Sequence, residues 1–373
     1  MTEIPVAVAA SSGLKLRKAA AWHGIRVLAW AGDVLYGCLG YQIVRLRVTP
    51  QIGEGAEWET VARLHPVWWR NLTSRTALSY RLVRDGFHAL AVIGSVQDAQ
   101  INDQTMVGAV PGALVTRIPD SDEFQITHQV RRGTRPLHIT AVPSGSIYWG
   151  EYFDNRERAE VHIYASTDRG RTWQIAYTFS AGSIRHVHNI VYDRWGDCLW
   201  ILTGDEGAEC KVLRASCDLR SVEEVLAGNQ QARAVASIPT QTGLYLSTDT
   251  PLEKNRVYRL DRRIDGAGNV EQVGDLASSS IYGCRVGEAM FFSTMIEPSI
   301  VNTGRQVHLT GSRDGTNWQV LARWKKDGWP MRYFQYGNVM LPNGENATRY
   351  LAATTIAVKP DDLVTTIWEV ESA

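Results

Sequence analysis

The sequence has no excess of charge of either sign. Its 373 residues include 39 Lys and Arg and 39 Asp and Glu, which gives a formal net charge of zero. Proteins that bind nucleic acid or a membrane surface by electrostatics depend on an excess of cationic side chains. We therefore expect no nucleic-acid partner and no membrane-surface role.

Long hydrophobic runs are also missing, and no window approaches the roughly 20 apolar residues that a transmembrane helix needs, so we expect no membrane insertion. The short apolar stretch Ile4–Ala10 has no basic residue ahead of it, which does not fit a secretory signal. Cysteines are few, odd in number and free of C-x-x-C pairs, which argues against a disulfide or zinc framework. These features predict a cytoplasmic protein with reduced thiols. The five cysteines are Cys38, Cys198, Cys210, Cys217 and Cys284.

Helical periodicity is nearly absent, and no G-x-G-x-x-G or P-loop motif occurs, which argues against the common nucleotide-binding folds. The chain consists instead of apolar runs of four to eight residues separated by Gly, Asp, Asn and Pro, as at Cys198–Thr203 and Ala289–Thr294. Such runs are typical of strands. The sequence therefore predicts an all-β protein, and its 44% hydrophobic content is enough for a large core.

The strands recur with a period. Six Asp-containing turns can be aligned, about 45–50 residues apart, which is the period of a four-stranded propeller blade. We predict a β-propeller of four-stranded blades in a single domain over 1–373. The aligned turns are Arg117–Asp120, Ser166–Gly170, Ser216–Arg220, Leu260–Arg263, Ser312–Gly315 and Val358–Asp361.

Seven modules can be drawn around these turns, although six blades remain an alternative because the first two modules are the least regular. The last module is one strand short. An N-terminal strand, either Ile4–Ala10 or Lys15–Ala21, would complete it and close the ring, which removes exposed sheet edges. The modules span 20–70, 75–132, 134–181, 183–228, 230–276, 278–330 and 332–373.

One turn carries a complete motif. Ser166–Trp173 matches the pattern S-x-D-x-G-x-T-W, Ser312–Trp318 is a copy shortened by one residue, and Ser216–Asp218 keeps only the first half. With these motifs the chain resembles the Asp-box, or BNR-repeat, propellers, a group that includes sialidases and other glycan-processing proteins. In such a turn the Asp carboxylate accepts backbone N–H bonds, Gly supplies a positive φ, and Trp packs between blades. The resemblance implies that the boxes are structural and lie on the face opposite the usual site.

The functional face is expected where the connection between blades and the loop after the second strand of each blade open together. Carboxylates follow second strands at Glu151, Asp205, Asp249 and, after a short offset, Glu297. Polar or aromatic residues stand where first strands begin. A carboxylate close to a His is suited to acid–base chemistry, so we predict Glu151, His188 and Asp205 as catalytic. The predicted substrate-binding residues are His138, Tyr152, Arg156, Arg158, Arg185, His186, Arg233, Asp249, Tyr282 and Tyr336.

The same residues have structural alternatives. His186 and His188 could instead bond backbone across blades, and Glu151 and Asp205 could cap loops or form interblade salt bridges. The His-x-His pair with acidic neighbours also suits a metal, but spacing fixes no third ligand. We therefore assign no metal and no cofactor.

A sialidase activity itself is not expected. Thr116–Pro119 has the letters of the sialidase arginine motif without its aromatic residue, and it falls at a turn between the third and fourth strands, on the wrong face. Arg135, Arg185 and Arg233 could form a different anion grip.

The predicted function is a carbohydrate-active propeller that processes or transfers a glycan in intracellular or surface-polysaccharide metabolism. Its ligand would be a carbohydrate or sugar conjugate. The alternative is a non-catalytic glycan-binding or protein-scaffold propeller, and the oligomeric state is left open. Aromatic faces stack on sugar rings. Among the 13 tryptophans, the candidate ligand contacts are Trp68, Trp69, Trp149 and Trp329.

Overall fold

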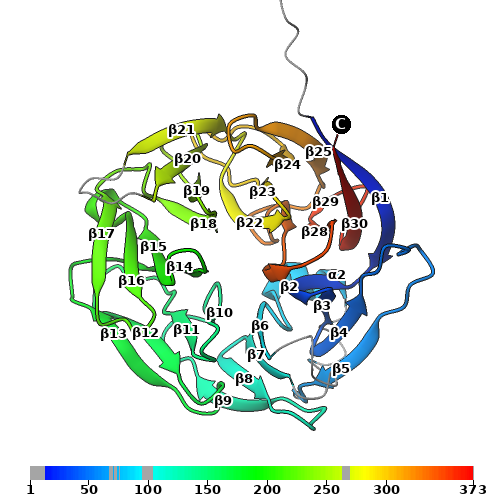
Figure 1. Ribbon diagram of the computed structural model, residues 1–373, viewed down its shortest axis with the longest axis horizontal. Helices are drawn as coiled ribbons and strands as arrows, with labels where there is room; N and C mark the ends of the chain where they lie inside the picture. Colours follow the sequence, from blue (N-terminus) through cyan, green and yellow to red (C-terminus); the bar gives the residue numbers. More distant parts are fainter. Residues whose placement is uncertain are drawn as a thin grey trace, which may run out of the picture.

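Seven sheets follow one another around a central channel in this computed structural model (Figure 1). The structure describes residues 13–66, 70, 74, 76–94, 104–262 and 269–372. The all-β propeller with seven blades is therefore confirmed, and the six-blade alternative is wrong. The strands of each blade fall within the module predicted for it, apart from β1 (Leu14–His23), which completes blade seven.

In the first three blades the strands run in chain order from the channel outward. Blade one consists of β2 (Arg26–Gly32), β3 (Val34–Leu39), β4 (Gln42–Arg47) and β5 (Glu59–Arg63). Blade two consists of β6 (Ala89–Ile93), β7 (Thr105–Val110), β8 (Ala113–Arg117) and β9 (Gln125–Gln129). Blade three consists of β10 (Thr140–Ala141), β11 (Ile147–Gly150), β12 (Val161–Ser166) and β13 (Gln174–Phe179).

The next three blades repeat this order. Blade four consists of β14 (His186–Asp193), β15 (Cys198–Gly204), β16 (Lys211–Ser216) and β17 (Val222–Ala227), with the short 3-10 helix η2 (Gly207–Glu209) after β15. Blade five consists of β18 (Ala234–Pro239), β19 (Gly243–Thr248), β20 (Arg256–Asp261) and β21 (Val270–Asp275). Blade six consists of β22 (Ser280–Val286), β23 (Ala289–Thr294), β24 (Gln306–Ser312) and β25 (Gln319–Lys326).

Blade seven closes the ring with both ends of the chain. From the channel outward its strands are β26 (Asn338–Met340), β28 (Tyr350–Ile356), β30 (Val364–Ser372) and β1 (Leu14–His23). β1 pairs antiparallel with β30 from Leu14↔Ser372 to His23↔Val364. Closure by an N-terminal strand is thus confirmed with the candidate Lys15–Ala21, whereas the other candidate, Ile4–Ala10, lies outside the described residues.

One of the six aligned turns is not equivalent to the others. Because β1 supplies the fourth strand of blade seven, Val358–Asp361 connects the second and third strands, β28 and β30, rather than the third and fourth. The prediction for that turn is wrong, and its strand β29 (Val358–Lys359) instead pairs with β25 of blade six. Of the turn Leu260–Arg263, Arg263 lies outside the described residues.

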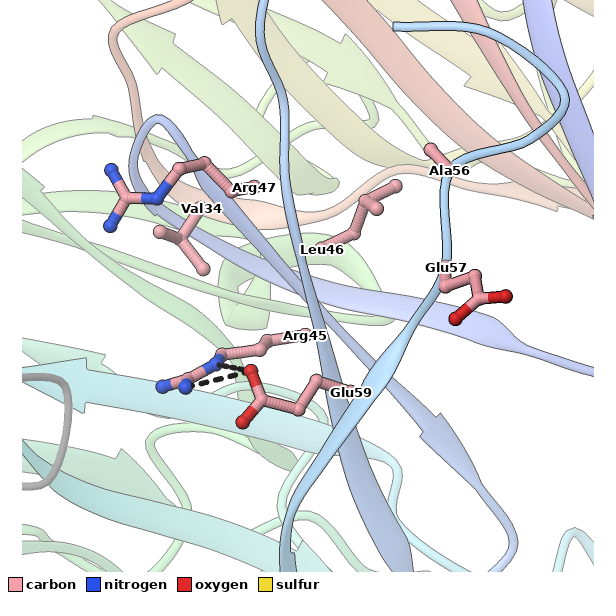
Figure 2. Close-up of a pocket in the computed structure, with 7 residues that line it drawn as sticks. All are labelled: Val34, Arg45, Leu46, Arg47, Ala56, Glu57 and Glu59. Atoms are coloured by element: carbon pink, nitrogen blue, oxygen red, sulfur yellow. Dashed lines mark hydrogen bonds and ion pairs between the residues drawn. The ribbon is translucent and has the colours of Figure 1, made fainter.

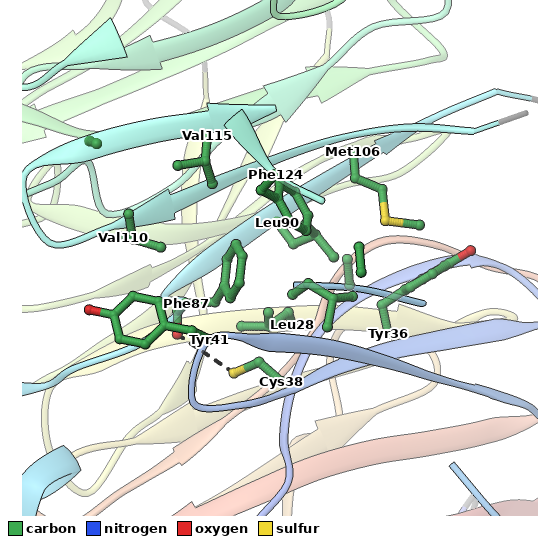
Figure 3. Packing of buried hydrophobic residues seen from close by; sticks show 14 of the residues in the cluster. Leu28, Tyr36, Cys38, Tyr41, Phe87, Leu90, Met106, Val110, Val115 and Phe124 are labelled. Atoms are coloured by element: carbon green, nitrogen blue, oxygen red, sulfur yellow. Dashed lines mark hydrogen bonds between the residues drawn. The ribbon is translucent and has the colours of Figure 1, made fainter. Parts of the chain in front are cut away.

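The apolar second strands form the core. β15, β19 and β23 are buried at every position, whereas the outer β17 and β21 are partly exposed. Figure 3 shows the cluster between blades one and two, where Phe87 lies among Leu28, Tyr41 and Leu90. A fully buried side chain of this size stabilises the fold by about 1.5–3 kcal/mol.

The turn of blade three has the predicted chemistry. The Asp168 carboxylate accepts the backbone N–H groups of Arg171 (3.0 Å) and Thr172 (2.9 Å) and the hydroxyl of Ser166 (2.7 Å). Burial opposes ionisation, but these bonds and the Thr172 hydroxyl hold the pKa of Asp168 at about 2. Gly170 has φ +83°, and a Cβ there would lie 2.5 Å from a Val107 methyl group of blade two.

Tryptophans that follow the two fuller boxes pack against the preceding blade. The indole N–H of Trp173 donates to Thr127 on β9 (3.2 Å), and Trp318 packs against Tyr245 on β19, with 6.2 Å between ring centroids. These contacts connect blade three to blade two and blade six to blade five.

Two connections cover parts of the central channel. The helix α2 (Ala77–Val83) lies between blades one and two, and its Arg81 pairs with Asp327 and Asp362. Strand β27 (Asn343–Asn346) runs parallel to β2 at the inner edge of blade one. α2 is in the connection between two blades, whereas β27 is in the connection between the first and second strands of blade seven, and these two kinds of connection open on opposite faces of the ring. The predicted site belongs to the face of the connections between blades.

All five cysteines are free. Within the described ranges, no helix is both long and apolar enough to cross a membrane.

Candidate functional site

Asp205 is the centre of a cluster at the channel mouth. It follows β15, and two guanidinium and two imidazole groups surround its carboxylate. The nitrogen–oxygen distances are 3.2 Å to Arg185, 3.3 Å to Arg233, 3.2 Å to His188 and 3.5 Å to His186. Arg233 also donates to the backbone oxygen of Asp205 (2.9 Å). Asp205 is therefore held by partners from blades four and five.

The first strand of blade four positions both histidines. The pairing of β14 with β15 shifts register between Val187 and Asn189, so His188 occupies a bulge, a feature that re-aims side chains near functional sites. The partner strand ends in Gly204, where an added Cβ would lie 2.8 Å from the His188 ring. Only glycine leaves room for the ring in this position.

Backbone carbonyl groups fix the position of one proton in each of the two imidazole rings. Nδ1 of His186 is 3.1 Å from the Phe153 oxygen, and Nδ1 of His188 is 2.9 Å from the Ala234 oxygen. Because a carbonyl oxygen can only accept, each Nδ1 carries the proton, and a neutral ring then has a lone pair at Nε2. The two Nε2 atoms are 3.1 Å apart. Burial lowers the pKa of His188, which favours its neutral form.

Asp205 is ionised. Burial would raise the pKa of Asp205, but hydrogen bonds and charge from His186 and His188, in the forms that carry a proton on Nε2, hold it far below the ordinary value.

A second acidic pair lies next to Asp205. The Asp249 carboxylate is 3.9 Å from the same Arg233 nitrogen that contacts Asp205. Burial raises the pKa of Asp249, and the charge of Glu297 raises it further; burial likewise raises the pKa of Glu297. Asp249 is buried, whereas Glu297 is partly exposed. The pair of Asp249 and Glu297 can therefore hold a proton, whereas the neighbouring Asp205 carboxylate cannot.

Tyr152 completes the cluster. Its ring centroid lies 4.3 Å from that of His186. Burial and the charges of Asp205, Asp249 and Glu297 raise the pKa of Tyr152 to about 12. The tyrosine therefore stays protonated, and its ring is partly exposed. We refer to the whole group as the Asp205 cluster; it consists of Tyr152, Arg185, His186, His188, Asp205, Arg233, Asp249 and Glu297.

Glu151 is placed apart from this group. Its carboxylate forms an ion pair with Arg132, which precedes blade three, and accepts the backbone N–H of His162 (2.9 Å). The Glu151 side chain therefore forms a salt bridge and holds a loop of blade three, which is the structural role given above as the alternative for this residue.

Two predicted arginines are engaged further out. Arg156 is exposed and pairs with Asp154 (2.9 Å), and Arg158 pairs with Glu209 on the neighbouring blade. Asp154 also pairs with Arg185 (2.6 Å), which links this outer loop to the Asp205 cluster.

Other predicted residues contact groups outside the Asp205 cluster. His138 and Tyr282 face each other with 6.4 Å between ring centroids; burial lowers the pKa of His138 to about 4 and raises that of Tyr282. Tyr336 precedes β26, and its backbone oxygen accepts a bond from Asn338 (3.1 Å). Arg135 donates to the Arg84 oxygen (2.8 Å), apart from the other two arginines of the expected anion grip.

The tryptophan candidates differ in exposure. Trp149 is 2% exposed and stacks on Tyr164, with 4.4 Å between ring centroids, so its prediction as a ligand contact is wrong. Trp329 is 38% exposed and lies over Arg81. Trp68 and Trp69 lie outside the described residues.

The sequence pattern gives Glu297 no predicted role, because this residue does not directly follow the end of β23. Its relation to Asp249 depends on the packing of blade six against blade five, and no local pattern encodes it.

A cavity of about 290 Å³ lies elsewhere, against blade one (Figure 2). It contains the ion pair between Arg45 and Glu59 (2.8 Å) and is lined mainly by β4 and the segment before β5. Its only ionisable groups are arginines and glutamates, with no imidazole, so the Asp205 cluster is the stronger candidate site.

The raised pKa of Asp249 predicts how the stability of the protein depends on pH. An unfolded Asp has a pKa of about 3.9. Because the folded pKa of Asp249 is raised, the folded state keeps a proton that the unfolded state loses, and stability falls as pH rises between these two values. We expect Asp249→Asn to be more stable than the wild type by about 1 kcal/mol at pH 8, and by less near pH 4. Urea unfolding at both pH values measures this.

Asp218→Asn is the matched control. Hydrogen bonds from Ser216 and Arg220 lower the pKa of Asp218, so its loss should reduce stability at pH 8. An Asp249→Asn protein that is less stable than the wild type at pH 8 would contradict the account of this pair.

Comparison of the sequence with known protein families and with curated proteins gave no match. Comparison with solved structures gave matches at low sequence identity. A chain from the crystal structure of the mitotic checkpoint complex is 11% identical with a TM-score of 0.56, with 100% of both chains covered. The WD40 propeller domain of Doa1 is 8% identical with a TM-score of 0.53, with 96% of this chain and 97% of that one covered.

An ancestral GH74 enzyme is 13% identical with a TM-score of 0.51. The match covers 98% of this chain and 48% of the enzyme, so the chain spans about half of that enzyme's length. At these identities the likeness shows the propeller fold alone.

Proposed function

We propose that the protein is a carbohydrate-active propeller that binds and processes a glycan at the Asp205 cluster. The observation that carries the proposal is the convergence of an aromatic ring, two guanidinium groups, two imidazoles and three carboxyl groups from four blades at one channel mouth. Sugar sites need convergent hydrogen-bonding side chains with an aromatic platform.

The side chains suit a hydrolytic or transfer step. The Asp249–Glu297 pair would donate a proton to the oxygen that leaves the anomeric carbon as the glycosidic bond breaks. The attacking water or sugar hydroxyl would bond to that carbon and give its proton to the Nε2 lone pair of His186 or His188. Tyr152 would support the sugar ring, and Arg185 and Arg233 would keep Asp205 oriented. General acid–base pairs of this kind depend on neighbouring groups with separated pKa values.

The motifs and the fold add support of different strength. The Asp-box resemblance rests on Ser166–Trp173 and Ser312–Trp318, and the turn contacts of Asp168 fit it. The GH74 neighbour gives weak support for a glycoside-hydrolase-like activity, since propellers host many functions. Five free cysteines fit a cytoplasmic location, where the substrate would be a nucleotide-linked or lipid-linked sugar.

The alternative is a propeller that holds a glycan or a protein without turnover. The WD40 neighbour has a comparable TM-score, so the fold favours neither function. The ionised Asp205 is also saturated with partners, which suits a positioning role as well as a catalytic one.

A thermal-shift screen tests the proposal. Neutral sugars, uronic and sialic acids and nucleotide sugars are added in excess to the wild type and to Tyr152→Ala, Glu297→Gln and Asp218→Asn. A ligand of the folded state raises the melting temperature by mass action. We expect one sugar class to stabilise the wild type and Asp218→Asn, which is changed on the opposite face, and the shift to be lost in Tyr152→Ala.

Product analysis then separates the two functions. Release or transfer of sugar by the wild type, lost in Glu297→Gln while binding persists, supports processing. Binding without product supports the non-catalytic alternative, and no shift with any sugar would contradict both glycan functions.

A further inference from the structure

We propose that His186, His188 and Asp205 form a binding site for a divalent transition-metal ion such as Zn²⁺. One ligand atom from each residue lies within 4.8 Å of the other two. Two imidazole nitrogens and one carboxylate are a ligand set that zinc and related ions bind in proteins, with positions left for water or substrate.

The first argument is the direction of the lone pairs. Phe153 and Ala234 accept the Nδ1 protons of the two rings, which leaves Nε2 of each ring as the atom that can bind an ion. These atoms are only 3.1 Å apart, and both face the Asp205 carboxylate. Electron-rich atoms at these distances repel one another unless a proton or a metal ion lies between them, and one metal ion can bind all three side chains at once.

The second argument is the size of the site. Zinc bonds of about 2.0–2.1 Å in a tetrahedral arrangement place neighbouring ligand atoms about 3.3 Å apart. The observed separations are 3.1 Å between the two Nε2 atoms, 3.2 Å from Nε2 of His188 to Oδ1 of Asp205 and 3.5 Å from Nε2 of His186 to Oδ2 of Asp205. The three side chains are therefore spaced for one ion with little rearrangement.

The third argument is the support around the ligands. A metal-binding histidine usually donates its other N–H to a carbonyl or carboxylate, and both rings here do so. Gly204 leaves the space for the His188 ring, and the bulge of β14 directs it. This support comes from three blades and holds the ligands in place before any ion binds.

Two guanidinium groups near Asp205 oppose a cation, and each has a second acidic partner. Arg185 pairs with Asp154 at 2.6 Å, and Arg233 lies 3.9 Å from Asp249. These acids offset the cationic charge that the ion would meet.

The metal site shares residues with the proposed function but does not rest on it, because the ligand geometry is the same whether or not a glycan is bound. In a glycan-processing enzyme the ion would occupy the imidazole lone pairs and would itself activate the attacking water by lowering its pKa, in place of the proton acceptor given above. The sequence pattern alone could not assign the site, because Asp205 lies 17 positions from His188.

Metal analysis of the full-length protein tests the proposal. The protein is stripped with chelator, incubated with excess Zn²⁺, desalted and measured by mass spectrometry of the metal. Co²⁺ is added in parallel, since its visible absorption reports nitrogen and oxygen coordination. We expect about one ion per chain in the wild type.

The variants are His186→Ala, His188→Ala and Asp205→Asn, with His162→Ala as the matched control on the third strand of blade three. We expect the His variants to lose affinity by about tenfold or more and His162→Ala to retain it. Circular dichroism checks folding, and Asp205→Asn keeps the test valid if a His variant unfolds. Less than stoichiometric metal in the folded wild type, or unchanged affinity in folded ligand variants, would overturn the site. Failure of the sugar screen with stoichiometric zinc would remove the proposed function and leave this site.

Discussion

Removal of residues 1–23 is expected to leave a chain that aggregates or loses its cooperative unfolding transition. The deletion takes away β1 and exposes β30 along its pairing with that strand. An unpaired edge is a template for pairing with other chains. Apolar contacts are lost as well, since Leu14 is 4% exposed and Ala20 is fully buried. We expect a loss on the order of 5 kcal/mol, which is comparable with the whole net stability of many domains.

A shorter deletion is the matched control. Removal of residues 1–12 keeps every pair between β1 and β30 and should leave the melting temperature near that of the wild type. A synthetic peptide of residues 13–23 added to the longer deletion should restore solubility by pairing with β30. A soluble 1–23 deletion with wild-type stability would contradict closure of the ring by β1.

Asp205→Ala is expected to destabilise the protein by about 3 kcal/mol and to abolish ligand binding at the channel mouth. Side chains of Asp205, Arg185 and Arg233 are 15%, 24% and 12% exposed, so removal of the carboxylate leaves two mostly buried cations without their shared partner. The loss of one partner of a buried ion pair typically costs 3–5 kcal/mol. Urea unfolding of the wild type and the variant measures this.

Glu345→Ala is the comparison for this prediction. Glu345 pairs with Arg194, but these side chains are 73% and 50% exposed. An exposed pair contributes about 1 kcal/mol or less, because water screens it. If Asp205→Ala were as mild as Glu345→Ala, Asp205 would not be the centre of the cluster.

Much of the fold could be predicted because short stretches of sequence determine its strands and turns. The second strands are continuously apolar, so β15, β19 and β23 could be located from hydrophobicity, and the box at Ser166–Trp173 fixed the phase of the repeat. The helix α2 and the true place of Val358–Asp361 could not be predicted in this way. Their positions depend on contacts with distant segments, such as the pair of Arg81 with Asp327 and the pairing of β1 with β30.

The candidate site could be predicted in part for the same reason. His186 and His188 begin an inner strand and Asp205 directly follows the neighbouring strand, so the period of the blade places them together. The sequence could not predict where the Glu151 side chain points, because this depends on Arg132, which lies in the connection before blade three and binds the Glu151 carboxylate. The link between Asp249 and Asp205 likewise depends on Arg233, which comes from between their blades.

The most direct test of a glycan site at the Asp205 cluster is hydrogen–deuterium exchange of the full-length protein with and without the sugar class that stabilises it. We predict slower exchange in the segments that follow β11, β15, β19 and β23, because these carry Tyr152, Asp205, Asp249 and Glu297. The turns between third and fourth strands on the opposite face should be unchanged. Protection confined to those turns, or to the outer strands of blade one, would contradict this account.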